Sequence, residues 1–160
     1  MSNNYVKGIL VSLPLAKANG IVEEALRLGR AEKMLPLTVA VLDVGGHLLS
    51  FQREDGSGIL RGDIATGKAW GALGMGISSR TISDRLKDRP AFQGAIATAS
   101  QGRLIPVPGG VLACNEDGHV IGSVGISGDT SDRDEYCAIL AIKSAGLVPN
   151  PEEENPNWNS

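Results

Sequence analysis

The stretch LTVAVLDVGGHLLSFQRE, residues 37–54, decides the fold. Branched apolar residues fill its first half, two glycines follow at positions 45 and 46, and apolar residues return in its second half. This pattern predicts a β-hairpin with a two-glycine loop. A second hairpin is expected where GVLACN (110–115) and HVIGSVGIS (119–127) flank the turn EDG. Each hairpin has a polar residue, a turn glycine and a histidine in the same order, so we interpret them as one loop solution used twice.

Helical patterns surround the two hairpins. Apolar residues recur at helical spacing over residues 12–34, with Ser12 as the expected cap. Further helices are predicted over 60–76, 78–86 and 90–100, and from Thr130 or Ser131 to about Gly146. The segment GRLIPVPGG (102–110) is expected to be an extended strand at an edge or in a loop, because its prolines cannot donate to a ladder. The predicted class is α+β, with a central antiparallel sheet flanked by helices.

Composition limits the protein class. The chain has 160 residues, 42% hydrophobic and 21% charged, with a net charge of −3. We expect one domain over residues 1–147 and a polar C-terminal tail over 148–160 that is mobile or lies over a neighbour. No basic stripe favours nucleic acid, and no apolar run reaches the ~20 residues of a membrane span. The N-terminus lacks signal-peptide features, so a cytoplasmic location with Cys114 and Cys137 as reduced thiols is expected.

The stretch RGDIATGKAW (61–70) matches a phosphate-binding loop except at its last position, where Ala69 stands in place of Ser or Thr. A phosphate-binding loop follows a buried strand, and none is expected here, so we interpret the stretch as part of a helix. Two stripes of small residues lie on opposite faces of that helix: Gly67, Gly71 and Gly74 form one, and Ala65, Ala69 and Ala72 form the other. These stripes predict a helix pressed between the sheet and a second layer, with another subunit as a candidate for that layer.

Two groups of residues are candidates for binding a ligand. His47 and His119 are the only histidines, and each begins a strand directly after a turn. Either could ligate haem iron, and the alternative is that both are solvated turn residues. The loop PVPGG (106–110) could present the backbone amides of Gly109 and Gly110 to a ligand, or it could be plain turn chemistry. Nothing in the spacing assigns a metal site, which stays unknown.

Charged residues around the second turn form a third candidate site. This cluster comprises Arg53, Asp55, Arg61 and Asp63. Arginine binds carboxylates through two parallel hydrogen bonds, so the cluster is either an anion clamp or a solvated loop joined by ion pairs. In an enzyme, Arg53 would hold a carboxylate, the Gly109 and Gly110 amides would stabilise an enolate-like oxygen, and Lys68 or Asp63 would move a proton. Lys68 serves this purpose only if burial lowers its pKa.

Several stretches taken together resemble the GlcG/HbpS-like family, also called the haem-degrading or DUF336 domain, which includes the C-terminal domain of PduO-type proteins. The matching pieces are AVLDVGGHLLSFQREDG (40–56), IATGKAWGAL (64–73) and GRLIPVPGGVLACNEDGHVIGSVGISGDTSDRDEYCA (102–138). The resemblance covers about residues 10 to 147. It implies a profilin-like α/β sandwich, a homo-oligomer, and binding of haem or related tetrapyrroles. Residues 80–98 and the acidic tail with Trp158 depart from the family's shared part.

Two functional hypotheses follow. The first is an oligomeric GlcG/HbpS-like protein that binds haem or another small ligand in a cleft near the PGG loop, with Gly109, Gly110, His47 and His119 as ligand-binding residues. The alternative is an enzyme of the lyase or isomerase type that acts on a small carboxylate-bearing metabolite, with Arg53, Asp63 and Lys68 as catalytic residues. Neither hypothesis includes nucleic acid or a membrane as a partner.

Overall fold

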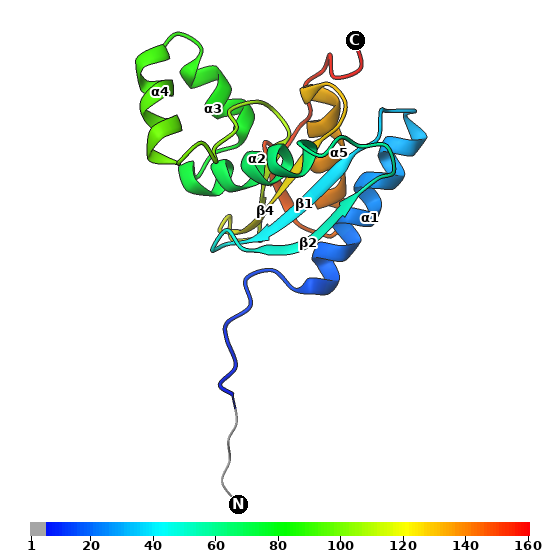
Figure 1. Cartoon of the computed structure of the whole chain (residues 1–160). Helices are drawn as coiled ribbons and strands as arrows, with labels where there is room; N and C mark the ends of the chain where they lie inside the picture. The colour runs from blue at the N-terminus through cyan, green and yellow to red at the C-terminus, as the bar shows by residue number, and fades with distance from the viewer. Residues whose placement is uncertain (1–5) are drawn as a thin grey trace, which may run out of the picture.

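A five-stranded sheet forms the centre of the structure, a computed structural model that describes residues 6–160 (Figure 1). The strands are β1 (Thr38–Asp43), β2 (Leu48–Arg53), β3 (Gly110–Cys114), β4 (Val120–Ser127) and β5 (Val148–Asn150). The helices are α1 (Leu15–Ala31), α2 (Arg61–Met75), α3 (Ser79–Leu86), α4 (Pro90–Ala99) and α5 (Ser131–Ser144). The strand order is β2-β1-β4-β3-β5, and each neighbouring pair is antiparallel. The predicted α+β class with a central antiparallel sheet is confirmed.

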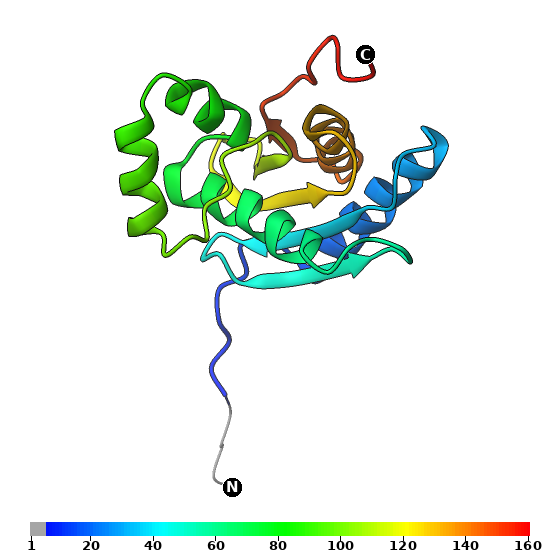
Figure 2. The ribbon, with the colours of Figure 1, turned by 45° about the horizontal axis from the view of Figure 1, so that its top comes forward.

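Helices cover both faces of the sheet. Helices α1 and α5 pack on one face, where their apolar residues meet every second residue of the strands, including Val39, Val41 and Val124. Helix α2 crosses the opposite face (Figure 2). The helix can approach closely because Gly125 of β4 has no side chain. A Cβ at this position would overlap the carbonyl oxygen of Ala65. The alternation of strand side chains therefore builds two helix-covered faces, one of them very tight.

Both predicted hairpins are present and share one loop design. The Asp43 carboxylate accepts hydrogen bonds from two amides of the 44–47 loop, and the Asn115 side-chain oxygen does the same in the 115–119 loop. Gly46 and Gly118 take the left-handed backbone at φ 82° and 81°. The first loop has four residues, with the two predicted glycines at its centre, because the Asp43 side chain caps a wider turn.

The predicted helices are found with one wrong cap. Helix α1 begins at Leu15, and the Ser12 hydroxyl accepts a hydrogen bond from the Val44 amide at 3.1 Å. Ser12 therefore ties the chain to the first hairpin loop and does not cap the helix. The cap expected at the start of α5 is correct, since Thr130 accepts from the Arg133 amide. Helix α3, for which no cap was predicted, is capped by Ser78, which accepts from the Thr81 amide.

The predicted strand within 102–110 is wrong, because residues up to Pro108 are irregular and β3 begins only at Gly110. Pro106 and Pro108 lack an amide hydrogen, and the segment instead follows α2, where the Ile105 amide donates to Gly67 O. The fifth strand comes from the segment that was expected to be a polar tail, either mobile or lying over a neighbour. Residues Val148–Asn150 pair with β3, and Trp158 stacks on Tyr136 with ring centroids 3.7 Å apart, so the tail packs on its own chain.

The two ends of the sheet differ, and we name them by their residues. Asp43 pairs with Gly122, so the two loops 44–47 and 115–119 lie together at what we call the hairpin end. Thr38 pairs with both Arg53 and Ser127, and Gly110 pairs with Gly125, so these residues mark the opposite end, the PGG end. The candidate residues of the sequence are thereby divided between two places.

Candidate functional site

Lys68 points from α2 into the interior at the PGG end. Its side chain is 2% exposed, and its Nζ donates to Asp134 Oδ2 at 3.0 Å and to Ile126 O at 2.8 Å. Asp134 lies in the first turn of α5, where the helix dipole favours a carboxylate, and it is 1% exposed. Its other oxygen accepts the Asp129 amide at 3.0 Å. The lysine predicted as a candidate from the sequence therefore forms a fully buried ion pair.

Burial changes the proton affinity of both partners. Loss of hydration lowers the pKa of Lys68, although the charge of Asp134 opposes this change. Loss of hydration also raises the pKa of Asp134 to about 6, with the charge of Lys68 acting against it. Both groups are thus shifted toward their neutral forms, as the predicted role of Lys68 requires.

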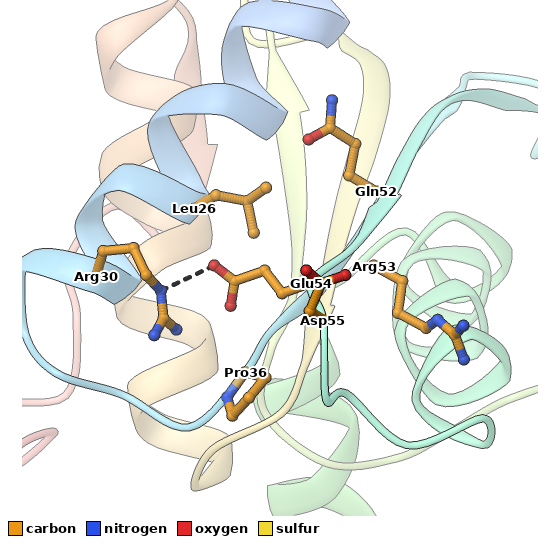
Figure 3. Close-up of a pocket in the computed structure, with 7 residues that line it drawn as sticks. All are labelled: Leu26, Arg30, Pro36, Gln52, Arg53, Glu54 and Asp55. Carbon is orange, nitrogen blue, oxygen red and sulfur yellow. Dashed lines mark ion pairs between the residues drawn. The ribbon is translucent and has the colours of Figure 1, made fainter.

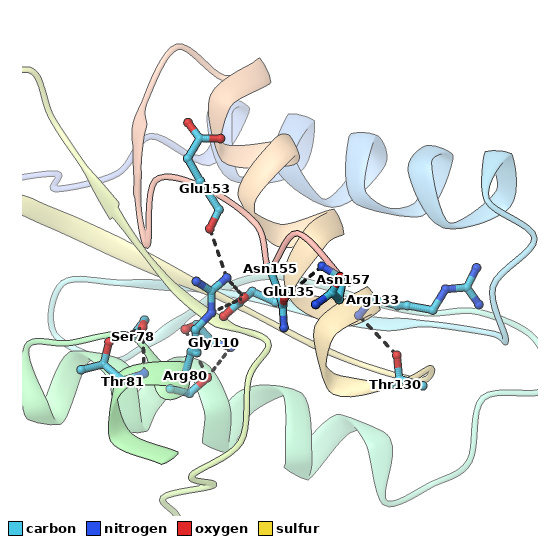
Figure 4. Close-up of polar contacts among 11 residues, drawn as sticks. Ser78, Arg80, Thr81, Gly110, Thr130, Arg133, Glu135, Glu153, Asn155 and Asn157 are labelled. Carbon is cyan, nitrogen blue, oxygen red and sulfur yellow. Dashed lines mark hydrogen bonds and ion pairs between the residues drawn. The ribbon is translucent and has the colours of Figure 1, made fainter. Parts of the chain in front are cut away.

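A second buried carboxylate adjoins this pair. Glu135 is fully buried, and its Oε1 accepts from Arg80 Nε at 2.7 Å and from Arg80 Nη2 (Figure 4). Its Oε2 is buried and has no hydrogen-bond partner among the described residues. Arg80 also donates to the carbonyl oxygen of Glu153 in the C-terminal segment at 3.1 Å. Burial raises the pKa of Glu135, and the hydrogen bond from Arg80 counteracts that rise.

The PGG loop covers the Lys68–Asp134 pair with backbone alone. Gly109 has φ +119°, and a Cβ there would lie 2.8 Å from Lys68 Nζ. The Gly110 amide donates to Ser79 Oγ at 2.7 Å, and the Ser79 hydroxyl donates to Gly110 O at 3.2 Å. The two glycines therefore permit close packing of the loop on α2 and α3, and the Gly110 amide is already bonded.

Arg53 and Asp63 face different hollows. A hollow of about 460 Å³ between α1 and the end of β2 is lined by Arg53, Asp55 and five other residues: Leu26, Arg30, Pro36, Gln52 and Glu54. Arg30 pairs there with Glu54 at 2.8 Å, and Figure 3 shows the Arg53 guanidinium turned away from this pair. Asp63 lines a groove on α2, and Lys68 lines neither hollow. The three residues assigned to an enzyme thus share neither of these two hollows.

The groove that includes Asp63 lies between α2 and residues 101–105, and we call it the α2 groove. Its volume is about 380 Å³, and its lining combines the apolar Leu60, Ile64, Trp70 and Ile105 with Asp63, Thr66, Gly67, Gln101, Gly102 and Arg103. The Arg103 guanidinium lies 3.9 Å from the centre of the Trp70 ring. Trp70 also borders a smaller hollow of about 170 Å³ beside the 44–47 loop. An aromatic ring with a cation above it suits a flat, carboxylate-bearing ligand.

The second layer on α2 is formed by the chain itself. A Cβ at Gly67 would lie 2.6 Å from Ile105 Cγ1, and one at Gly71 would lie 2.8 Å from Leu104 Cγ. The glycine stripe of α2 therefore packs against residues 103–105 of the same chain. The sequence analysis had suggested another subunit at this position. The alanine stripe faces the sheet as expected, since Ala65, Ala69 and Ala72 are fully buried.

Both histidines lie at the hairpin end, away from Gly109 and Gly110. His47 is 82% exposed, with Nδ1 3.4 Å from Asp43 Oδ1, and His119 is also exposed. In the part of the chain that the structure describes, no group of three or more His, Cys, Asp or Glu side chains is arranged to hold a metal ion. The four residues predicted to bind one ligand are therefore divided between the two ends of the sheet.

The sequence analysis did not select Asp134, Glu135 or Arg80 as candidate residues. A signal was present nonetheless. Asp134 lies four residues before Ala138 and seven before Ala141, both fully buried, so it continues the apolar face of α5. An acidic residue on such a face requires a buried partner.

Comparisons with known proteins agree with this architecture. Residues 13–143 match the family described as haem degrading protein HbpS-like. An uncharacterized 15.0 kDa protein from the dhaT-dhaS intergenic region of Citrobacter freundii is 30% identical over 133 residues, covering 83% of this chain and 92% of that protein. The ORFY protein of Klebsiella pneumoniae, a DUF336 structure, is 27% identical with a TM-score of 0.76, over 91% of this chain and 98% of that one.

The crystal structure of a PduOC:haem complex has a TM-score of 0.77 and 24% identity, over 86% of this chain and 97% of that one. At this identity the likeness shows a shared fold. The family match over residues 13–143 and the 30% identical relative show the family as well as the fold. The chain belongs to the HbpS-like family.

Proposed function

We propose that the protein is an oligomeric, cytoplasmic binding protein whose small ligand lies in the α2 groove beside the segment that leads to the PGG loop, and that haem is the first ligand to test. The observation that carries this proposal is the lining of the α2 groove. Apolar side chains and the Trp70 ring form its wall, and the Arg103 guanidinium lies over that ring. An apolar wall suits a tetrapyrrole ring, and arginine suits its carboxylates.

A loop that carries a histidine adjoins the Trp70 ring. A Cβ at Gly46 would lie 3.1 Å from Trp70 Cδ1, so the 44–47 loop that carries His47 rests against the ring that borders the groove. His47 is therefore our first candidate for an iron ligand, and His119 in the neighbouring loop is the second. The haem complex among the solved relatives supports the choice of haem as probe.

The oligomer is supported by apolar surface that the chain leaves uncovered. Ile9 and Leu10 are 88% and 96% exposed on a segment that extends away from the fold, and α4 buries none of its residues (Figure 1). A second subunit would remove this surface from water. Light scattering should then give a mass that is a multiple of 16.7 kDa, and a monomer at micromolar concentration would contradict the oligomer.

Two observations bear on the proposed cytoplasmic location. None of the described helices combines the length and apolar character that crossing a bilayer requires. Cys114 and Cys137 are free and buried, which fits a reducing compartment.

Haemin titration tests the ligand. We expect a stoichiometric Soret band with the wild type and an affinity about tenfold lower for Arg103→Gln, which corresponds to ~1.4 kcal/mol. Arg27→Gln, which removes an exposed arginine on α1, is the matched control and should bind as the wild type does. Replacing His47 or His119 by alanine identifies an axial ligand by the change in the Soret band. Absence of stoichiometric binding, or equal binding by both arginine variants, would overturn the proposal.

Acid–base chemistry is the second candidate, favoured by the burial of Lys68 beside Asp134. Because the hollows that Arg53 and Asp63 line do not include Lys68, such chemistry needs the partners that the structure places around the lysine.

A further inference from the structure

Three positions in the chain place a glycine directly after an aspartate or asparagine: Asn19–Gly20, Asp55–Gly56 and Asp117–Gly118. In such a pair the glycine amide nitrogen can attack the preceding side-chain carbonyl carbon, because glycine has no side chain to obstruct the approach. The product is a five-membered succinimide, and its hydrolysis gives mainly isoaspartate, in which the main chain runs through the former side chain. An amide held in a hydrogen bond must first lose that bond, which slows the attack.

Two of the three pairs have a glycine amide that is held in this way. Gly20 lies in the second turn of α1, where each amide donates to the carbonyl four residues before it. The Gly118 amide donates to Asn115 O at 3.0 Å, and the Asn115 side chain also accepts the Asp117 amide. Attack by either glycine nitrogen therefore requires a backbone hydrogen bond to break.

The Asp55–Gly56 pair lies at the tip of the turn that follows β2 and has a free amide. The Ser57 amide donates to Glu54 O at 3.0 Å and closes this turn. The Gly56 amide, between them, donates to no atom of residues 6–160. Asp55 is exposed at the edge of the hollow beside α1, and its carboxylate forms no ion pair or hydrogen bond within those residues (Figure 3). Both reacting groups are therefore free to meet.

Exposure and backbone shape do not distinguish this pair from Asp117–Gly118. Both aspartates are exposed, and the glycines that follow them have φ of 84° and 81°. Both turns also have room for a succinimide ring. A Cβ at Gly118 would meet nothing within 4 Å, and one at Gly56 would meet only Pro36 Cγ, at 3.5 Å. The two pairs thus differ in the hydrogen bond of the glycine amide, which makes Asp117 an internal control for Asp55.

We propose that Asp55 is a site of spontaneous isomerisation to isoaspartate, and that the fold slows the same attack at Asp117 and Asn19. The Gly56 nitrogen forms a bond to Asp55 Cγ, and the hydroxyl of the protonated carboxyl group leaves with the amide proton as water. A second water then adds to the Asp55 main-chain carbonyl carbon, and the bond from that carbon to nitrogen breaks. No oxidant, metal or further reactant is needed. The reaction does not depend on a ligand in the α2 groove.

Isomerisation would change the wall of the hollow between α1 and β2. Isoaspartate adds one methylene to the main chain and attaches the carboxylate directly to Cα. The residues on either side of the tip are fixed, since Glu54 Oε2 accepts the Leu37 amide at 2.7 Å and Ser57 Oγ lies 2.7 Å from Thr38 Oγ1. The added length is therefore expected to break the bond between Ser57 and Glu54 that closes the turn, and to move the carboxylate within the hollow.

Ageing of the full-length protein tests the site. The folded protein is incubated at physiological temperature and neutral pH, and samples are digested with a protease that cuts before aspartate but not before isoaspartate. Mass spectrometry then follows cleavage at each position, with a sample taken at the start as reference. We expect cleavage before Asp55 to decline about tenfold faster than cleavage before Asp117, because freeing the Gly118 amide breaks a hydrogen bond.

Two comparisons separate the effect of the fold from that of the local sequence. In urea that unfolds the chain no amide is held, so Asp55 and Asp117 should isomerise at similar rates, and Asn19 should lose its amide faster than in the folded protein. Asp55→Glu should remove most of the isoaspartate that a methyl-transfer assay detects, because glutamate would have to form a larger ring. The matched variant Asp117→Glu should leave the rate at Asp55 unchanged.

Three results would overturn the proposal. They are equal rates at Asp55 and Asp117 in the folded protein, a difference between them that persists in urea, and an isoaspartate signal that survives in Asp55→Glu.

Discussion

The two ends of the sheet are formed by the same strands but contain different kinds of residue. The hairpin end holds His47, His119 and two loops whose polar side chains satisfy their own backbone. The PGG end holds Lys68 and Asp134, which are 2% and 1% exposed and therefore depend on each other. Histidines in turns are easily noticed in the sequence. The groups with shifted pKa values, Lys68 and Asp134, instead lie buried beneath the PGG loop. The comparison teaches that candidate chemistry is better sought in buried charges than in residue type.

The largest expected effect on stability comes from removing one charge of the buried Lys68–Asp134 pair. Lys68→Met leaves Asp134 buried without its cation, and we expect it to lower the free energy of unfolding by about 3–5 kcal/mol. Lys68→Met/Asp134→Asn should recover at least half of that loss, because no buried charge remains. Urea unfolding of both variants measures the difference. Equal losses in the single and double variants would show that the charges do not interact.

The pair should also give the PGG end its own pH dependence. The pKa of Asp134 is raised to about 6 in the fold, so between pH 4 and 6 the folded state holds a proton that the unfolded state has lost. The stability of the wild type relative to the double variant should therefore fall as pH rises through this window, by up to ~1.4 kcal/mol per pH unit. Above the lowered pKa of Lys68 the sign reverses, because there the unfolded state holds the extra proton.

Urea unfolding at several pH values provides this measurement. The difference between wild type and double variant removes the contributions of the other carboxylates, such as Asp129, whose lowered pKa acts in the opposite direction. A difference that is constant from pH 4 to 6 would contradict the shifted pKa of Asp134.

Two glycines of α2 differ in their surroundings, since Gly67 is tightly packed and Gly74 has open space beside it. A Cβ at Gly67 meets Ile105, so Gly67→Ala should destabilise the protein by about 1–3 kcal/mol through overpacking. Gly74 has nothing within 4 Å, so Gly74→Ala should stabilise the same helix by about 1 kcal/mol. Thermal unfolding of the two variants measures both signs. A loss of stability at Gly74 would indicate a contact, such as a subunit interface, over that part of α2.

The smallest effects are expected at the hairpin end. His47 and His119 are exposed, so replacing either by alanine should change the free energy of unfolding by less than about 0.5 kcal/mol. If haem binds as proposed, these variants should change the Soret band of the haemin complex and leave stability unaltered. A large destabilisation by either variant would break the distinction between the two ends.

Local patterns predicted most of the fold. Alternating apolar residues and turn glycines identified both hairpins, and the capping residue Thr130 located the start of α5, because these signals act over a few residues. The fifth strand was missed because Val148–Asn150 is short and contains Pro149, and its pairing with β3 is a contact with residues about 35 positions away. The prolines at 106 and 108 weakened a strand prediction that the structure rejects.

The candidate site was predictable only in part. The sequence selected Lys68 and the two glycines above it, and the structure brings these three together. It could not supply Asp134, which lies 66 residues from Lys68, because only the packing of α2 and α5 around the sheet joins them. It also grouped His47 and His119 with Gly109 and Gly110, although the strand register places the two pairs at opposite ends.

The proton affinity of Lys68 can be measured directly in the intact protein. NMR of the protein with ¹³C-labelled lysine follows the Cε signals as pH changes, and Lys68→Met/Asp134→Asn identifies the signal of Lys68 by its absence. A titration below the ordinary lysine pKa is the predicted result, as required for a buried amine that exchanges a proton with Asp134. If Lys68 titrates at or above the ordinary lysine pKa, the PGG end holds an ordinary structural ion pair and acid–base chemistry by Lys68 is excluded.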